Sequence, residues 1–313
     1  MKGLELSRKY YEAYGVSMLE SQFPEVLPYL AIGLVGGGSE CFGFDDEISR
    51  DHDFEPGFCV FLPEEDIVDS RTAFQLERAY AKLPKEFMGY HRNALHPVGG
   101  NRHGVIRVGD FFESKVGSRN GQLTTQGWLS VPEYALAEAV NGEIFSDPYG
   151  LFTKIREDLK RMPEDIRLKK LAGHLLLMGQ SGQYNYMRCM ERQETGAAQL
   201  SVVEFTKSAM QVVFLLNQTY MPYYKWSFRA LRELPLLSEL SDTFEYFISS
   251  GNGQTESLDK YRRMEDVCKV ITDELHRQGL TTYSSSEMEG QAYAVNACIK
   301  DGDIRNRHVL CAV

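Results

Sequence analysis

The chain has 313 residues, of which 43% are hydrophobic and 25% charged, which is typical of a soluble globular protein with room for about two domains. Its formal net charge of −10 excludes a broad basic surface for nucleic acid. No apolar run reaches the ~18 residues that a membrane span needs, and the six cysteines form no CxxC pair, so we expect a cytoplasmic protein without membrane, zinc or disulfides.

The first half of the chain alternates between helical and strand patterns. A helical pattern over residues 4–29 leads to the apolar run 31–35, which predicts a short buried strand that ends in glycines. A second buried strand is predicted at residues 58–62. Pro63 and the acidic residues after it are typical of a helix start, so we expect a helix from there to residue 83.

Further along the chain, the pattern changes from mixed helices and strands to helices alone. A third strand is expected at residues 105–108, with helices at 111–116 and 131–140. Beyond an Asp-Pro pair, helical periodicity dominates. The predicted fold class is therefore α+β, with a sheet-containing domain at residues 1–148 and a helical domain at 149–313.

A glycine turn and a pair of aspartates form the main candidate site. The turn follows the first predicted strand, and its backbone N–H groups and one hydroxyl suit the oxygens of a triphosphate. Two residues apart in an extended chain, two carboxylates point to one side. They repel each other unless a cation lies between them, and Mg²⁺ prefers carboxylate and phosphate oxygens. The candidates are Gly37, Gly38 and Ser39 for phosphate, and Asp51 and Asp53 for Mg²⁺.

Each half of this pattern is common by itself, but the two together resemble a known family. The segment 38–53 resembles the signature of the bacterial domain of unknown function 4037, in which a glycine-serine turn precedes Asp-x-Asp. Further resemblance lies at residues 163–167, Gln180, Gly196 and 221–226. The resemblance implies a nucleotidyltransferase-type mixed sheet with flanking helices, followed by a helical domain on the substrate side. It also implies a third carboxylate on a neighbouring strand.

The chain departs from the family pattern on that strand. The polar candidate there is Arg107, and a guanidinium neither binds a metal ion nor accepts a proton. Two interpretations stay open. In one, Arg107 contacts phosphate, and Asp110 or Glu113 supplies the catalytic carboxylate. In the other, the protein binds nucleotide and does not transfer it.

Two further cations are candidates for phosphate binding. Arg50 precedes the aspartate pair, where it either contacts phosphate or forms a structural salt bridge. Lys225 lies in an aromatic segment after a proline, and it either reaches the triphosphate or begins a helix whose Trp226 lies in the core.

The sequence therefore predicts a Mg²⁺-dependent nucleotidyltransferase. It would move a nucleoside monophosphate from a nucleoside triphosphate, with ATP the expected one, to a hydroxyl of an unknown small-molecule or macromolecular acceptor, and release pyrophosphate. The alternative is a catalytically attenuated nucleotide-binding or regulatory protein. The predicted catalytic residues are Asp51, Asp53 and Asp110, and the predicted nucleotide ligands are Gly37, Gly38, Ser39, Arg50, Arg107 and Lys225.

Overall fold

The computed structural model of the protein describes residues 1–50, 54–92 and 103–313, and it divides into two compact units. The first unit comprises Met1–Leu123 and Val131–Arg161, and the second comprises Thr124–Ser130 and Met162–Val313. The boundary expected after residue 148 therefore falls inside the first unit, for a reason that lies in the packing of helix α7 (Leu151–Leu159).

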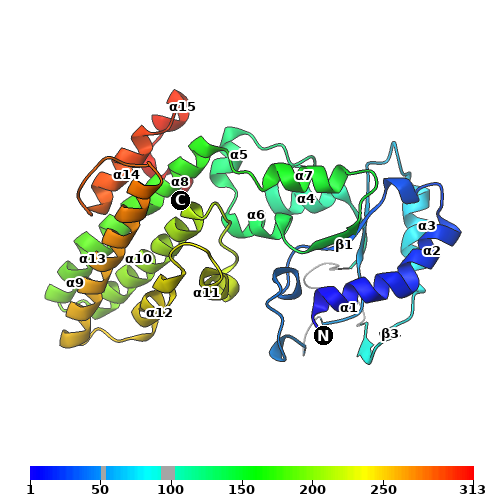
Figure 1. The fold of residues 1–313 in the computed structure, drawn as a ribbon, viewed down its shortest axis with the longest axis horizontal. Helices are drawn as coiled ribbons and strands as arrows, with labels where there is room; N and C mark the ends of the chain where they lie inside the picture. Colours follow the sequence, from blue (N-terminus) through cyan, green and yellow to red (C-terminus); the bar gives the residue numbers. More distant parts are fainter. Residues whose placement is uncertain (51–53, 93–102) are drawn as a thin grey trace. The chain divides into compact units, whose positions relative to one another are not determined.

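A four-stranded mixed sheet, of which β1 is labelled in Figure 1, forms the centre of the first unit. Its strand order is β5-β2-β1-β6. Its strands are β1 (Ala31–Leu34), β2 (Cys59–Leu62), β5 (Gly104–Arg107) and β6 (Glu143–Ser146). Strand β1 pairs antiparallel with both β2 and β6, and β2 pairs parallel with β5. A small hairpin joins β3 (Glu86–Phe87) to β4 (Tyr90–His91). The predicted mixed sheet is confirmed, and β6 is a strand that the sequence analysis missed.

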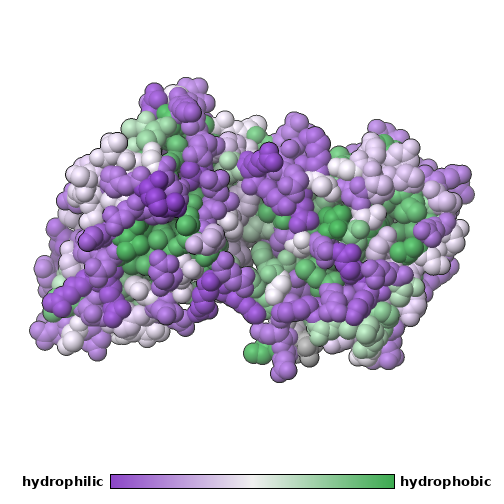
Figure 2. Space-filling view, viewed as in Figure 1, coloured by the Kyte–Doolittle hydropathy of each residue, from purple (hydrophilic) through white to green (hydrophobic). Residues whose placement is uncertain are grey.

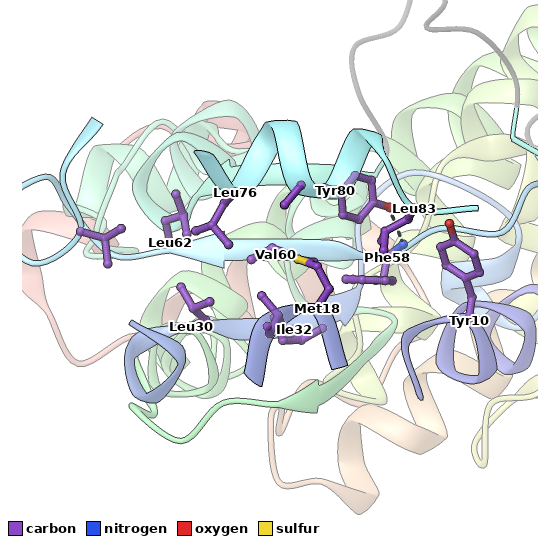
Figure 3. Close-up of a cluster of buried hydrophobic side chains, with 13 residues drawn as sticks. Tyr10, Met18, Leu30, Ile32, Phe58, Val60, Leu62, Leu76, Tyr80 and Leu83 are labelled. Atoms are coloured by element: carbon purple, nitrogen blue, oxygen red, sulfur yellow. Dashed lines mark hydrogen bonds between the residues drawn. The ribbon is translucent and has the colours of Figure 1, made fainter. Parts of the chain in front are cut away.

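Three helices pack against one face of this sheet. They are α1 (Gly3–Tyr10), which a π-helical turn (Tyr11–Gly15) joins to α2 (Val16–Gln22), and α3 (Ser70–Ala81). Ile32 of β1 and Val60 of β2 point to this face and are fully buried among apolar side chains of these helices (Figure 3). The Tyr80 hydroxyl accepts a hydrogen bond of 3.0 Å from the backbone N–H of Phe58, which ties α3 to the start of β2.

Helices α4 (Val108–Val116), α6 (Glu133–Val140) and α7 form a second packed layer of the first unit. Alternation along β2 turns Phe61 away from the cluster of Figure 3. Its ring centroid lies 4.3 Å from that of Phe152 on α7 and 5.4 Å from that of Phe111 on α4. Phe152 is fully buried, so α7 completes the core of the first unit.

The helix that we expected from Pro63 begins at Ser70 instead. Asp69 is its N-cap, and the carboxylate accepts a hydrogen bond of 2.7 Å from the Thr72 N–H. Residues 63–68 form a loop instead, and Arg107 donates hydrogen bonds to the carbonyls of Pro63 and Val68 at its two ends, as described below. The local helix-start signal is therefore wrong here, and a distant side chain binds the loop.

The second unit is a bundle of helices. They are α5 (Thr125–Ser130), α8 (Glu164–Met178), a π-helical segment (Gly179–Tyr186), α9 (Met187–Glu191), α10 (Thr195–Leu216), α11 (Tyr224–Arg232), α12 (Ser241–Ser249), α13 (Gln254–Arg277), α14 (Met288–Ala297) and α15 (Gly302–Arg305). Helix α8 packs against α10 and α14. Lys169 of α8 is fully buried, and its ammonium donates to the carbonyls of Arg305 and Arg307 and to Asn296. These bonds fasten the C-terminal segment to the bundle.

Short 3-10 turns complete the secondary structure, at Leu27–Tyr29, Glu40–Phe42, Ile48–Arg50, Ser238–Leu240 and Val309–Ala312. Hydrophilic side chains cover most of the visible face of each unit (Figure 2). None of the helices in the described part of the chain has the length and apolar character needed to cross a membrane. The α+β class, with a sheet unit followed by helices, is confirmed.

Candidate functional site

The turn after β1 has a backbone conformation that requires glycine. Gly36 has φ +104° and Gly38 has φ +132°, a region that residues with a Cβ rarely adopt. A Cβ on Gly38 would also lie 2.3 Å from Oε1 of Glu40, whose side chain is buried. Ser39 follows, half-buried, with its Oγ 3.5 Å from Oε2 of Glu40. A side chain at position 38 would therefore be strained, and it would displace either the Glu40 carboxylate or the turn itself.

Asn141, just after α6, fixes this turn from the side. Its Oδ1 accepts a hydrogen bond of 2.8 Å from the Gly36 N–H, and its Nδ2 donates one of 2.8 Å to the Gly36 carbonyl. The next residue, Gly142, donates from its N–H to the Cys41 carbonyl at 2.8 Å. Because the Asn141 side chain binds both the N–H and the carbonyl of Gly36, the segment after α6 fixes the position of the turn.

A cavity of about 780 Å³ lies beside the turn, entirely within the first unit. Its volume is in the range of ~300–1,000 Å³ that is usual for small-molecule sites. Gly36, β2, β5, α3 and α4 line it. Three of the predicted site residues, Gly37, Arg107 and Asp110, reach this one cavity.

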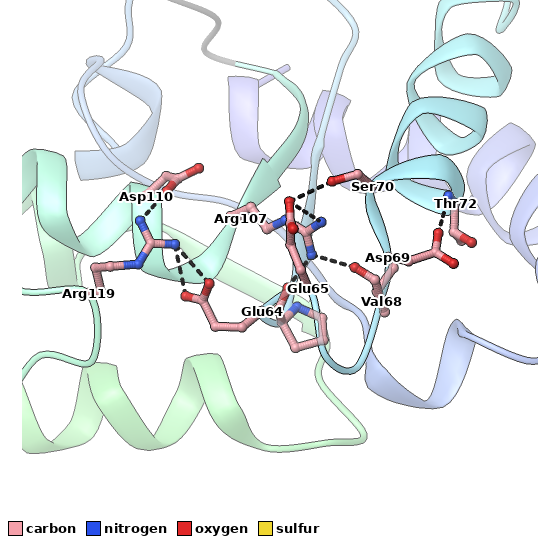
Figure 4. A network of polar contacts seen from close by, with 10 residues as sticks. Glu64, Glu65, Val68, Asp69, Ser70, Thr72, Arg107, Asp110 and Arg119 are labelled. Carbon is pink, nitrogen blue, oxygen red and sulfur yellow. Dashed lines mark hydrogen bonds and ion pairs between the residues drawn. The ribbon is translucent and has the colours of Figure 1, made fainter.

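The guanidinium of Arg107 binds the loop that precedes α3 (Figure 4). Its Nη1 donates to the carbonyls of Pro63 and Val68, both at 2.6 Å, and its Nη2 lies 3.8 Å from Oε1 of Glu65. Only 13% of the side chain is exposed. Arg107 therefore has a structural task in the first unit, and its contact with phosphate stays a prediction.

We expect Arg107→Ala to lower the free energy of unfolding by about 1.5–3 kcal/mol, the usual contribution of hydrogen bonds to a charged group. Thermal melting measures this loss, with Arg71→Ala, an exposed arginine on α3, as the control. The affinity for MgATP, measured where both variants are folded, should stay within about twofold of the wild type if the role is structural only. A large loss of affinity without loss of stability would identify Arg107 as a phosphate ligand.

Asp110 lies at the start of α4 and is paired with Arg119 (Figure 4). Arg119 also binds both carboxylate oxygens of Glu64 at 2.9 Å and approaches Glu113 at 3.2 Å. The hydrogen bonds that Arg119 donates to Glu64, followed by the one to Asp110, raise the pKa of Arg119. The Asp110 side chain is 57% exposed, so this ion pair is weak and exchangeable. Its predicted role as a catalytic base stays a prediction.

Two charged residues that the sequence analysis missed lie next to the glycine turn. The ammonium of Lys115, on α4, donates to Oε2 of Glu138, on α6, at 2.6 Å. A Cβ on Gly37 would lie 3.7 Å from both carboxylate oxygens of Glu138, and a Cβ on Gly36 would lie 3.9 Å from Cε of Lys115. Lys115 also lines the cavity. These residues meet through the packing of α4 on α6, for which the sequence carries no short-range signal.

Cys59 is the cysteine that lines the cavity. It is buried on β2, and this burial raises the pKa of its thiol to about 12. The thiol therefore stays protonated at neutral pH and is not an activated nucleophile.

The chain that leads towards the predicted metal ligands is anchored by the N-terminus of α1. Asp45 is buried, and its Oδ2 accepts a hydrogen bond of 2.8 Å from the Gly3 N–H. The Lys2 ammonium donates to the carbonyls of Gly43 and Asp45 at 3.1 and 2.5 Å. These contacts fix residues 43–45, which precede the aspartate pair.

Asp51 and Asp53 themselves lie outside the described residues, and the predicted Mg²⁺ site stays a prediction. Arg50 ends the 3-10 turn before them, and the role of its side chain also stays a prediction. Within residues 1–50, 54–92 and 103–313, no three His, Cys, Asp or Glu side chains gather as metal ligands would.

Lys225 belongs to the second unit. It lies in the first turn of α11, is exposed, and places its Nζ 5.0 Å from the centroid of the Trp226 ring. Two exposed tyrosines precede it, Tyr223 and Tyr224, with ring centroids 4.3 Å apart. Its predicted contact with the triphosphate stays a prediction.

A comparison with protein families matches residues 128–227 to the family described as domain of unknown function DUF4037. The resemblance to this family is thereby confirmed. The matched segment contains Glu138 and Asn141, beside the glycine turn, as well as Lys225. It does not include the turn or the aspartate pair. No curated protein matches the chain.

Proposed function

The chain carries a DUF4037 segment at residues 128–227, and from this premise we propose that its first unit binds a nucleoside triphosphate with Mg²⁺ and transfers the nucleoside monophosphate to an acceptor hydroxyl. The observation that carries the proposal is the glycine turn after β1. Asn141 holds its backbone, Gly36 and Gly38 adopt conformations that residues with a side chain rarely adopt, and a cavity of ligand size lies beside it.

The turn is suited to phosphate because residues without a side chain let a ligand approach its backbone N–H groups closely. We expect the N–H groups of Gly37, Gly38 and Ser39, with the Ser39 hydroxyl, to donate to phosphate oxygens. The donor set of Asp51 and Asp53, two carboxylates, fits Mg²⁺, which when bound neutralises phosphate charge. A nucleotidyltransferase-type fold for this unit is part of the proposal.

The proposed reaction is an in-line displacement at the α-phosphate. The acceptor hydroxyl oxygen forms a bond to the α-phosphorus, the bond from that phosphorus to the α,β-bridging oxygen breaks, and pyrophosphate leaves with the electron pair. The hydroxyl proton passes to a carboxylate, for which Asp110 is the first candidate because it lines the cavity. The protein contributes positioning and charge neutralisation, which dominate this chemistry.

One observation favours a second candidate function. Strand β5 consists of Gly104, Val105, Ile106 and Arg107, so it carries no carboxylate, and Arg107 is bound to the loop before α3. Without another base, the first unit would bind nucleotide and not transfer it. The protein would then act as a nucleotide-binding or regulatory protein.

A combined binding and turnover assay tests the proposal. Calorimetry with MgATP is expected to show binding, and pyrophosphate release should appear with some members of a panel of hydroxyl-bearing acceptors. Asp110→Asn should abolish pyrophosphate release and leave the MgATP affinity within about twofold, because the base acts in transfer and not in nucleotide binding. Glu64→Gln is the matched control, because Glu64 is also a carboxylate partner of Arg119 and does not line the cavity.

The outcomes separate the candidates. Binding without pyrophosphate release for any acceptor would favour the regulatory protein, and absence of MgATP binding would contradict both. Equal release by wild type and Asp110→Asn would remove Asp110 from the reaction.

A further inference from the structure

Lys115 and Arg107 both line the cavity, but their N–H groups have different hydrogen-bond partners. Arg107 binds two backbone carbonyls at 2.6 Å and serves the fold. Lys115 has a single partner among the described residues, the Glu138 carboxylate at 2.6 Å. An ammonium carries three N–H donors, so two of them are open to a ligand while the ion pair stays intact.

The position of Lys115 relates it to the turn as well as to the cavity. Its Cε lies 3.9 Å from where a Cβ on Gly36 would be, and the Glu138 oxygens lie 3.7 Å from the corresponding point on Gly37. Both side chains are partly buried, 23% and 22% exposed, which limits the freedom of the ammonium. Asn141 fixes the backbone of Gly36, so the ammonium lies beside a turn whose position is set by the fold.

We propose that Lys115 is a phosphate-binding residue of this site and that Glu138 is the positioning residue that holds the ammonium beside the glycine turn. This inference rests on the proposed function, because it needs a nucleotide whose phosphates lie at the turn. The inferred ligand is a polyphosphate. Its oxygens would contact the Lys115 ammonium and the N–H groups of Gly37–Ser39 at the same time. A lysine serves phosphate as a compact point charge, which suits such a shared site.

The test is calorimetric titration of the full chain with Mg²⁺ and an ATP analogue that has a methylene group between the α- and β-phosphates. Lys115→Met should weaken binding of this analogue by roughly 10- to 100-fold, the equivalent of one hydrogen bond to a charged group. Binding of adenosine, which has no phosphate, should not change. The matched control is Lys154→Met on α7, because Lys154 is paired with Asp158 at the same 2.6 Å and does not line the cavity.

Lys115→Met leaves the Glu138 carboxylate without its partner, so a second variant protects the test against misfolding. Lys115→Met with Glu138→Gln removes both charges together and should lose the same affinity while it melts near the wild-type temperature. Lys115→Arg keeps the charge and should bind the analogue better than Lys115→Met.

Three outcomes would overturn the inference, and they differ in what else they affect. If the wild type binds the analogue and both methionine variants bind it equally well, Lys115 is no phosphate ligand and the proposed function is untouched. An equal loss for adenosine and for the analogue would assign Lys115 to the packing of the cavity. If the wild type itself does not bind the analogue, the proposed function falls and this inference falls with it.

Discussion

Replacement of Asp51 and Asp53 together by asparagine is expected to abolish Mg²⁺-dependent triphosphate binding. Asparagine keeps the size of the side chain and removes the negative charge that attracts the cation. Mutation of a residue that merely hydrogen-bonds to a metal ligand typically lowers metal affinity by about 10–100-fold. Loss of two residues that bind the metal directly should therefore lower it by at least ~100-fold. Calorimetry with MgATP measures the effect, and thermal melting should show little change.

A matched control distinguishes this effect from a general change in charge. Asp66→Asn removes an exposed carboxylate of the same unit that does not line the cavity. It should bind MgATP like the wild type. If the double variant also binds MgATP like the wild type, Asp51 and Asp53 are not the metal ligands.

Gly38→Val is the second substitution with a large expected effect. The new side chain faces two obstacles, a φ of +132° and a Cβ position 2.3 Å from the buried Glu40 carboxylate. The Glu40 side chain can shift to relieve the contact, but the φ strain is relieved only if the turn changes conformation, and its N–H groups then leave the positions proposed for phosphate. We expect triphosphate affinity to fall by at least ~30-fold, with a loss of stability of about 1–3 kcal/mol from backbone strain.

Gly150→Val controls for the strain alone. Gly150 precedes α7 with φ +75°, and a Cβ there would meet nothing within 4 Å. This variant should melt at a lower temperature and still bind MgATP normally. Normal MgATP binding by Gly38→Val would show that the turn is not the phosphate site.

The local parts of the site were predictable from the sequence. Apolar runs predicted β1 and β2, and the glycines between them predicted a turn that glycine makes more easily than other residues, which agrees with the positive φ values of Gly36 and Gly38. Such signals are local because backbone sterics and the alternation of a strand act within a few residues.

The features that complete the site depend on contacts between distant segments. Asn141 and Glu138 reach the turn because α6 packs on α4, and β6 joins the sheet through β1. The contact of Arg107 with phosphate stays a prediction, but its bonds to the carbonyls of Pro63 and Val68, which lie far before it in the chain, could not be predicted. Neither periodicity nor motif spacing reports such pairings, since they arise only when the helices and the sheet have packed together.

The central claim is that the glycine turn of the first unit binds the phosphates of a nucleotide. A crystal structure of the protein with Mg²⁺ and the α,β-methylene analogue of ATP tests it most directly. We expect phosphate oxygens within hydrogen-bonding distance of the N–H groups of Gly37, Gly38 and Ser39, with the metal ion on Asp51 and Asp53. Nucleotide bound elsewhere, with the turn and its cavity empty at saturating analogue, would contradict it.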